Sequence, residues 1–149
     1  MASQIYVNLP VKDLNRSIDF FTRLGYTFDP QFTNENATCM IIGESIFVML
    51  LMEPFFQGFA SKPICDATKA TEVILALSVE SRARVDELVA KAVAAGGTTP
   101  RPAQDLGFMY QHGFDELDGH AWGVFQRTSS PGAAPAAGAE GEGGDWGTA

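Results

Sequence analysis

The chain has 149 residues, of which 46% are hydrophobic and 19% are charged, and this composition is typical of a single globular domain with a sizeable core. Its formal net charge of −8 argues against binding to nucleic acid or to an anionic membrane surface, because both require a basic face. No run approaches the roughly 20 apolar residues of a membrane helix, and the first residues lack the pattern of a signal peptide. Cys39 and Cys65 have neither metal-binding nor disulfide-framework spacing, so we expect a reduced, cytoplasmic protein.

The first half of the domain, about residues 4–52, predicts one strand, one helix and three further strands. Alternating apolar and polar residues in QIYVNLPV, at 4–11, predict the first strand. Asp13 can cap a helix with an apolar stripe, and Gly25 is placed to end it. The three further strand-like runs lie at 26–32, 37–42 and 45–52. Glu53 and Pro54 are then expected to begin a loop.

The second half, about residues 72–127, repeats this order. EVILALSV, at 72–79, predicts a strand, and Ser81 can cap a helix that Gly96 and Gly97 close. Three more strands are expected near 98–102, 107–114 and 120–126. The pattern βαβββ therefore occurs twice, which indicates a repeated architecture.

The folded domain is expected to end near residue 127. Residues 128–149 are a Gly/Ala/Pro-rich acidic segment that cannot bury enough surface to offset the entropy of ordering, so we expect this tail to be disordered. Within residues 4–127 we predict an α+β fold, in which two helix-backed antiparallel sheets curl around a cleft. Such a cleft is the default position for a ligand site.

Two motifs resemble the vicinal oxygen chelate superfamily, which includes glyoxalase I, extradiol dioxygenases, fosfomycin resistance enzymes and the bleomycin resistance protein. NLPVKDLNRSIDFFTRLGYTF, at 8–28, is similar to the opening strand, helix and strand of that family. FDELDGHAWGVF, at 114–125, is similar to its closing F-x-D-P-D-G-[NH] turn and strand, with Glu116 and Leu117 where Asp and Pro are usual. The resemblance covers about residues 4–127. It implies the glyoxalase/bleomycin resistance fold and a homodimer.

The enzymes of this superfamily commonly hold a divalent cation with His, Gln or Glu side chains from four strands. The resemblance carries these positions onto Tyr6, Leu50, Ile74 and Gly123. Tyr6 alone has a donor atom, and a phenol is a poor ligand for a divalent cation at neutral pH. We therefore expect no metal at the usual position and no cofactor.

A relocated site is the alternative. Glu72 shares a strand face with Ile74, and His112 and Tyr110 lie on or near the seventh strand, so these three could form a catalytic acid–base set. Glu72 and His112, with His120, could instead hold a divalent metal. The simpler interpretation places Glu72 and His112 at a solvated rim and His120 at the surface or in a stabilising turn.

The residues expected to line the cleft suit a flat or aromatic organic ligand, because they form an apolar floor with a few polar groups. We expect ligand contacts from Tyr6, Asn8, Leu50, Ile74, Gly123 and Phe125. Our first hypothesis is metal-independent binding of a small aromatic or apolar molecule, similar to bleomycin resistance proteins. The alternatives are a divergent glyoxalase, lyase or dioxygenase with a relocated metal or acid–base site, and an interaction protein without a small-molecule role.

Overall fold

The computed structural model describes residues 3–127, and the predicted disordered tail at 128–149 lies outside the described residues. The elements of the first module are β1 (Ile5–Val11), α1 (Leu14–Arg23), β2 (Thr27–Phe28), β3 (Ala37–Gly43) and β4 (Ile46–Met52). A short helix, α2 (Glu53–Gln57), follows them. The elements of the second module are β5 (Ile74–Ser78), α3 (Arg82–Ala94), β6 (Gln104–Asp105), β7 (Met109–Asp115) and β8 (Ala121–Arg127). The predicted α+β class with two βαβββ modules is confirmed.

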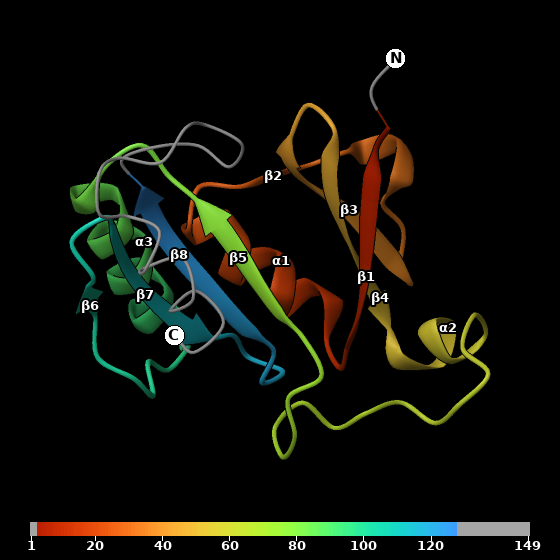
Figure 1. The fold of residues 1–149 in the computed structure, drawn as a ribbon. Helices are drawn as coiled ribbons and strands as arrows, with labels where there is room; N and C mark the ends of the chain where they lie inside the picture. The colour runs from red at the N-terminus through yellow and green to blue at the C-terminus, as the bar shows by residue number, and fades with distance from the viewer. Residues whose placement is uncertain (1–2, 128–149) are drawn as a thin grey trace.

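Each module forms a four-stranded sheet, and the two sheets lie side by side (Figure 1). The strand orders are β1-β4-β3-β2 and β5-β8-β7-β6. The first strand of each module pairs with the last in parallel, whereas the remaining pairs are antiparallel. The sheets are therefore mixed, whereas we expected purely antiparallel sheets. In each module the helix and two strands lie between the members of the parallel pair, which gives the long connection that a parallel pair requires.

The two long helices begin and end where the sequence predicted. The Asp13 side chain accepts a hydrogen bond from the Arg16 backbone N–H, and the Ser81 side chain accepts one from that of Arg84, each at 3.1 Å. These bonds satisfy donors that the first turn of a helix leaves free. Gly25 follows α1 with a φ of +104°, a conformation that glycine adopts at little cost.

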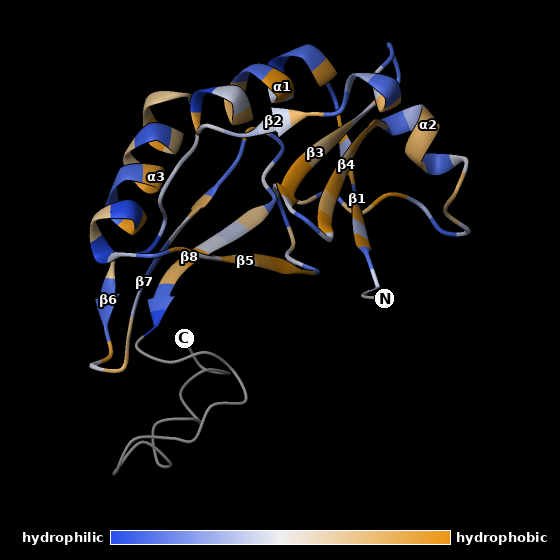
Figure 2. Ribbon diagram, turned by 90° about the horizontal axis from the view of Figure 1, so that it is seen from above, coloured by the Kyte–Doolittle hydropathy of each residue, from blue (hydrophilic) through white to orange (hydrophobic). Residues whose placement is uncertain are grey.

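Both helices cover the same side of the two sheets (Figure 2), and one hydrophobic core joins the modules. Phe20 and Phe21 of α1 reach across to the second sheet. The Phe20 ring centroid lies 6.0 Å from that of Phe114, and the Phe21 centroid lies 5.2 Å from that of Trp122. The first helix therefore packs on strands of the other module as well as on its own.

The strand predicted at 26–32 is much shorter than expected. Only Thr27–Phe28 pairs as β2, and Pro30–Phe32 forms a 3₁₀ turn. Asp29 caps this turn by accepting a hydrogen bond from the Gln31 backbone N–H at 2.9 Å. Proline lacks the N–H that a ladder needs, so the strand stops before it.

Two other predictions differ from the structure. The strand expected at 98–102 lies instead at Gln104–Asp105, and Thr98 makes only an isolated bridge to Asp115. The loop expected from Glu53 is the helix α2, with proline in its first turn. Proline is well suited to that position, because the first turn of a helix has free N–H groups in any case. None of the helices in residues 3–127 has the length and apolar character needed to cross a membrane.

Candidate ligand-binding pocket

A pocket of about 340 Å³ lies on the face of the second sheet that the helices leave uncovered. Ile74, Ala76, Ala121, Gly123 and Phe125 form its floor, from the paired strands β5 and β8. The neighbouring residues Leu75, Trp122 and Val124 belong to the core on the other side, as strand alternation requires. The small residues in the middle of this floor leave space above the sheet that a flat ring could occupy.

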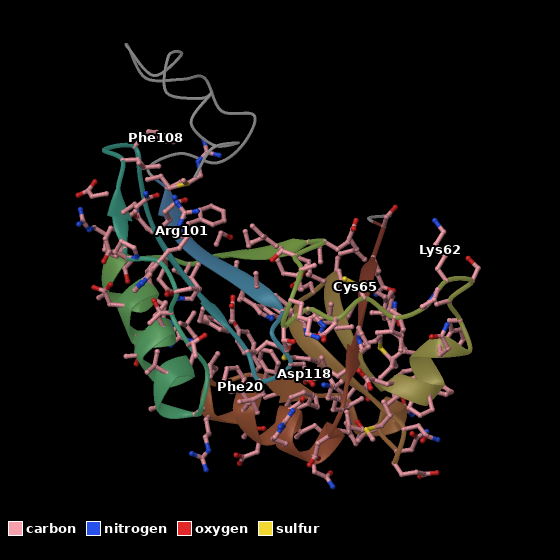
Figure 3. The ribbon with its side chains drawn as sticks, turned by 90° about the horizontal axis from the view of Figure 1, so that it is seen from below. Phe20, Lys62, Cys65, Arg101, Phe108 and Asp118 are labelled. Carbon is pink, nitrogen blue, oxygen red and sulfur yellow. The ribbon has the colours of Figure 1, made fainter. Side chains whose placement is uncertain are left out.

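Polar groups stand at the rim of this pocket, on the loop before β6 and on β7. Figure 3 shows Arg101 beside the second sheet. The His112 ring holds the loop before β6 in place. Its Nε2 lies 3.0 Å from the Arg101 carbonyl oxygen and 2.9 Å from Thr99 Oγ1. A carbonyl oxygen only accepts, so the bond to Arg101 requires a proton on Nε2. His112 is thereby suited to fixing the rim.

Three of the residues expected to contact a ligand, Ile74, Gly123 and Phe125, do line this pocket. Their role in binding stays a prediction. Tyr6 and Asn8 lie on β1 in the other sheet, outside the pocket. The Tyr6 ring stacks on Phe47 with centroids 4.8 Å apart, and its hydroxyl donates to Gln4 at 3.0 Å. The Asn8 side chain donates to the Tyr6 carbonyl oxygen at 3.2 Å.

The expectation that Leu50 faces the cleft is wrong. Leu50 is fully buried in the core beneath the helices, opposite Leu9 of β1. Strand β4 reads IFVMLLM and is apolar at every position, so alternation of polarity could not identify its inner face. The Tyr6–Phe47 stack shows that Phe47 shares the Tyr6 side of the sheet, and Leu50 points the opposite way.

The predicted acid–base residues do not meet at one place. The Tyr110 hydroxyl donates to Asp86 of α3 at 2.6 Å, and the Arg82 guanidinium carbon lies 4.3 Å from the Tyr110 ring centroid. This hydrogen bond to a carboxylate raises the pKa of Tyr110. Tyr110 is therefore bonded to the helix, His112 is bonded to the loop at the rim of the pocket, and Glu72 is exposed on the linker before β5.

The residues at the positions of the superfamily's metal do not fit a divalent cation. Tyr6 offers a phenol that is already engaged with Gln4, Leu50 is in the core, and Ile74 and Gly123 have no donor. Within residues 3–127, no three His, Cys, Asp or Glu side chains lie close enough together to hold a metal ion. Catalysis by a divalent cation needs N and O ligands that converge on the metal and leave positions open for the substrate, and the residues at these four positions do not supply such ligands.

The turn between β7 and β8 holds a buried acid–histidine pair that the sequence analysis did not predict. One oxygen of Glu116 accepts hydrogen bonds from the backbone N–H groups of Asp118 and His120, at 2.9 and 3.0 Å. Its other oxygen lies 3.0 Å from Nδ1 of His120. His120 is only 9% exposed and its backbone N–H bonds to Glu116 within the turn, so of the two simpler placements, at the surface or in a stabilising turn, the structure has the one in the turn. The sequence signal that could have revealed this pair is the spacing of four residues between Glu116 and His120.

Asp118 ties the same turn to the start of α1. Its Oδ1 accepts from the Lys12 backbone N–H at 3.1 Å and from the Arg16 guanidinium at 3.4 Å. Its Oδ2 accepts from the Ser17 hydroxyl at 3.4 Å. These bonds connect the motif that closes the domain with the motif that opens it, across about a hundred residues of sequence.

The His120–Glu116 pair predicts a pH-dependent contribution to stability. Burial alone lowers the pKa of His120, but the hydrogen bond and charge of Glu116, with the charge of Asp118, raise it above its usual value. A raised pKa favours folding when the ring is protonated, so the contribution is full below about pH 6.5 and is lost as pH rises through the folded-state pKa. Urea denaturation of the wild type and His120→Gln should show a difference in unfolding free energy that shrinks over this range. A difference that stays constant with pH would contradict this prediction.

Comparison with known proteins agrees with this fold. A glyoxalase-related enzyme from Fulvimarina pelagi superimposes with a TM-score of 0.74 at 21% identity, over 90% of this chain and 94% of that one. A hypothetical protein from S. aureus gives a TM-score of 0.72 at 28% identity, over 85% and 94% of the two chains. The fosfomycin resistance protein FosX from Listeria monocytogenes gives 0.62 at 17% identity, over 87% and 94%. A search of curated proteins found no match.

The chain therefore has the fold of the glyoxalase/bleomycin resistance/dioxygenase proteins, which is the fold that its two motifs implied. Within that class, residues 5–43 match the family model described as bleomycin resistance protein-like N-terminal.

Proposed function

We propose that the chain binds a small aromatic or apolar organic molecule on the open face of the second sheet, without the help of a metal. The observation that carries this proposal is the low floor made by Ala76, Ala121 and Gly123 between the larger side chains of Ile74 and Phe125. A pocket of about 340 Å³ with an apolar floor and a few polar groups at its rim has the usual character of a small-molecule site. The match to a bleomycin-resistance-like family model supports the same function.

The test fills the floor of the pocket. A Cβ added at Gly123 would meet Ala76 Cβ at 3.5 Å, which is ordinary contact, so a larger side chain can enter the pocket without displacing the backbone. A panel of aromatic compounds is first screened by thermal shift, and hits are titrated by calorimetry. We expect Gly123→Phe to weaken a hit by about tenfold or more, because the ring occupies the ligand's volume.

Gly43→Phe is the matched control, because Gly43 ends β3 in the other sheet and a Cβ there would meet only Ile46, at 3.9 Å. It should leave affinity unchanged. Equal binding by the wild type and Gly123→Phe would contradict the proposed site. A loss of binding after treatment with a chelator would contradict the metal-independent mode.

A divergent enzyme is the second candidate, since one of the similar structures is described as a glyoxalase-related enzyme. Glu72, His112 and Tyr110 were the residues expected to catalyse, and a divalent metal was the alternative cofactor. If a turnover reaction is found, its rate in Glu72→Ala and His112→Ala decides their roles. We favour binding because Tyr110 and His112, although both on β7, are bonded to different neighbours, and Glu72 lies on the linker before β5.

We also propose that two chains pair as a homodimer, as the resemblance implies. Strands β1 and β5 are edge strands of the sheets formed by residues 3–127, and their exposed side chains include Ile5 and Ile74, at 55% and 62%. Exposed edges with apolar side chains are suited to covering by another chain. Sedimentation should give the mass of two chains, and a monomer at high concentration would contradict this.

A further inference from the structure

A second pocket of about 170 Å³ lies between β1, the linker before β5 and the turn before β8. The apolar part of its wall includes Pro10, Phe56 and Val73. Cys65 and His120 also line the pocket. The linker passes close to this turn, where Cys65 and Asp118 are labelled in Figure 3. An engineered apolar cavity of about 150 Å³ holds benzene, so this volume suits a molecule with a single ring.

His120 gives this pocket one directed polar group. The ring is 91% buried, and its Nδ1 faces the Glu116 carboxylate at 3.0 Å. In the neutral ring a carboxylate favours a proton on that nitrogen, which leaves Nε2 as a hydrogen-bond acceptor. The pKa of His120 is raised, and the protonated ring donates from both nitrogens, so the binding tests below are made at a pH above that pKa. No hydrogen bond within residues 3–127 involves Nε2. Nε2 therefore has no protein partner, and it is not among the polar atoms that are fully closed off from solvent, so a molecule in the pocket that His120 lines could bond to it.

The charges around the pocket select against anions. Glu116 and Asp118 lie beneath His120, and Glu72 lines the pocket as well. A negatively charged ligand would meet the Glu72 carboxylate at the wall of the pocket, and none of the lining residues within 3–127 is a Lys or Arg that could offset it. A neutral donor would satisfy Nε2 without that repulsion.

We propose that this pocket is a second ligand site, which takes a neutral molecule with one ring and one hydroxyl, of the phenol class, whose O–H donates to Nε2 of His120. The site shares only Ala121 with the larger pocket, and it does not depend on the function proposed for that pocket.

Phenol and fluorobenzene are the two probes, because they have similar size and only phenol can donate. Calorimetric titration of the full chain should show phenol binding about fivefold more tightly, the range expected for one neutral hydrogen bond. Phenol should also slow the alkylation of Cys65 by iodoacetamide. Cys65 is exposed and lines the pocket, whereas Cys39 is only 3% exposed, so the reaction reports on this site.

Two variants separate this site from the larger pocket. Ala70 is an exposed linker residue that lines the smaller pocket, so Ala70→Phe should fill it with little effect on folding and abolish phenol binding. Gly123→Phe should leave phenol binding and Cys65 protection unchanged. The proposal is overturned by equal affinities for the two probes, by no saturable phenol binding, or by phenol binding that persists in Ala70→Phe. Loss of phenol binding in Gly123→Phe alone would place phenol in the larger pocket and would also overturn it.

Discussion

Replacing Asp118 by alanine is expected to lower the free energy of unfolding by about 3 kcal/mol, because it removes the buried charged acceptor of three hydrogen bonds and leaves one buried donor without a partner. The Asp118 side chain is 5% exposed and accepts from the Lys12 backbone, the Arg16 guanidinium and the Ser17 hydroxyl. Of these donors, the Ser17 hydroxyl belongs to a residue only 2% exposed, so water cannot readily replace the carboxylate there. Urea denaturation followed by circular dichroism gives the change.

Arg16→Ala is the control for the Asp118 prediction. The Arg16 side chain is 46% exposed, and ion pairs with an exposed partner contribute at most about 1 kcal/mol. The expected order is therefore a large loss for Asp118→Ala and a small loss for Arg16→Ala. Equal losses in the two variants would mean that the ion pair, and not the buried hydrogen bonds, holds the turn to α1.

Replacing Gly119 by alanine is expected to cost about 2–5 kcal/mol, from backbone strain and overpacking together. Gly119 has a φ of +88°, and a Cβ there would lie 2.8 Å from backbone atoms of Ala67 and Thr68. A backbone cannot give way as a flexible side chain does, so the linker must move off the turn. Urea denaturation measures the loss, and faster tryptic cleavage after the exposed Lys69 would report the displaced linker.

Gly107→Ala is the matched control, because Gly107 has a φ of +87° and no atom within 4 Å of the added Cβ. It should show the strain alone, about 1–2 kcal/mol, with unchanged cleavage of the linker. If Gly119→Ala and Gly107→Ala lose the same stability, the contact between linker and turn contributes nothing.

Local signals predicted most of the architecture. Asp13 and Ser81 are strong N-caps, Gly25 is a strong helix end, and β5 alternates between core and open faces. These features depend on neighbours within a few residues, so periodicity and capping chemistry suffice. The βαβββ repeat and the open face of the second sheet, with Ile74, Gly123 and Phe125, followed from them.

What depends on distant neighbours could not be predicted in the same way. Leu50 lies in a strand that is apolar throughout, so only the tertiary packing decides which face is buried. Parallel pairing of β1 with β4 depends on a crossover and leaves no local mark. Glu116 and His120 are buried in a turn that the linker contacts at Gly119, although their sequence reads as an exposed polar loop. Charged residues are rarely buried without partners, and these partners are recognisable only in three dimensions.

Because Phe20 and Phe21 pack against Phe114 and Trp122, neither half of the repeat has a complete hydrophobic core of its own. A repeat whose halves fold independently can lose or exchange one half, but here each half supplies part of the hydrophobic core of the other. A fragment ending before the linker would present two phenylalanine rings to water, and it should aggregate or pair with its missing half. The two halves therefore share one architecture but are expected to fold and unfold together, as one cooperative unit.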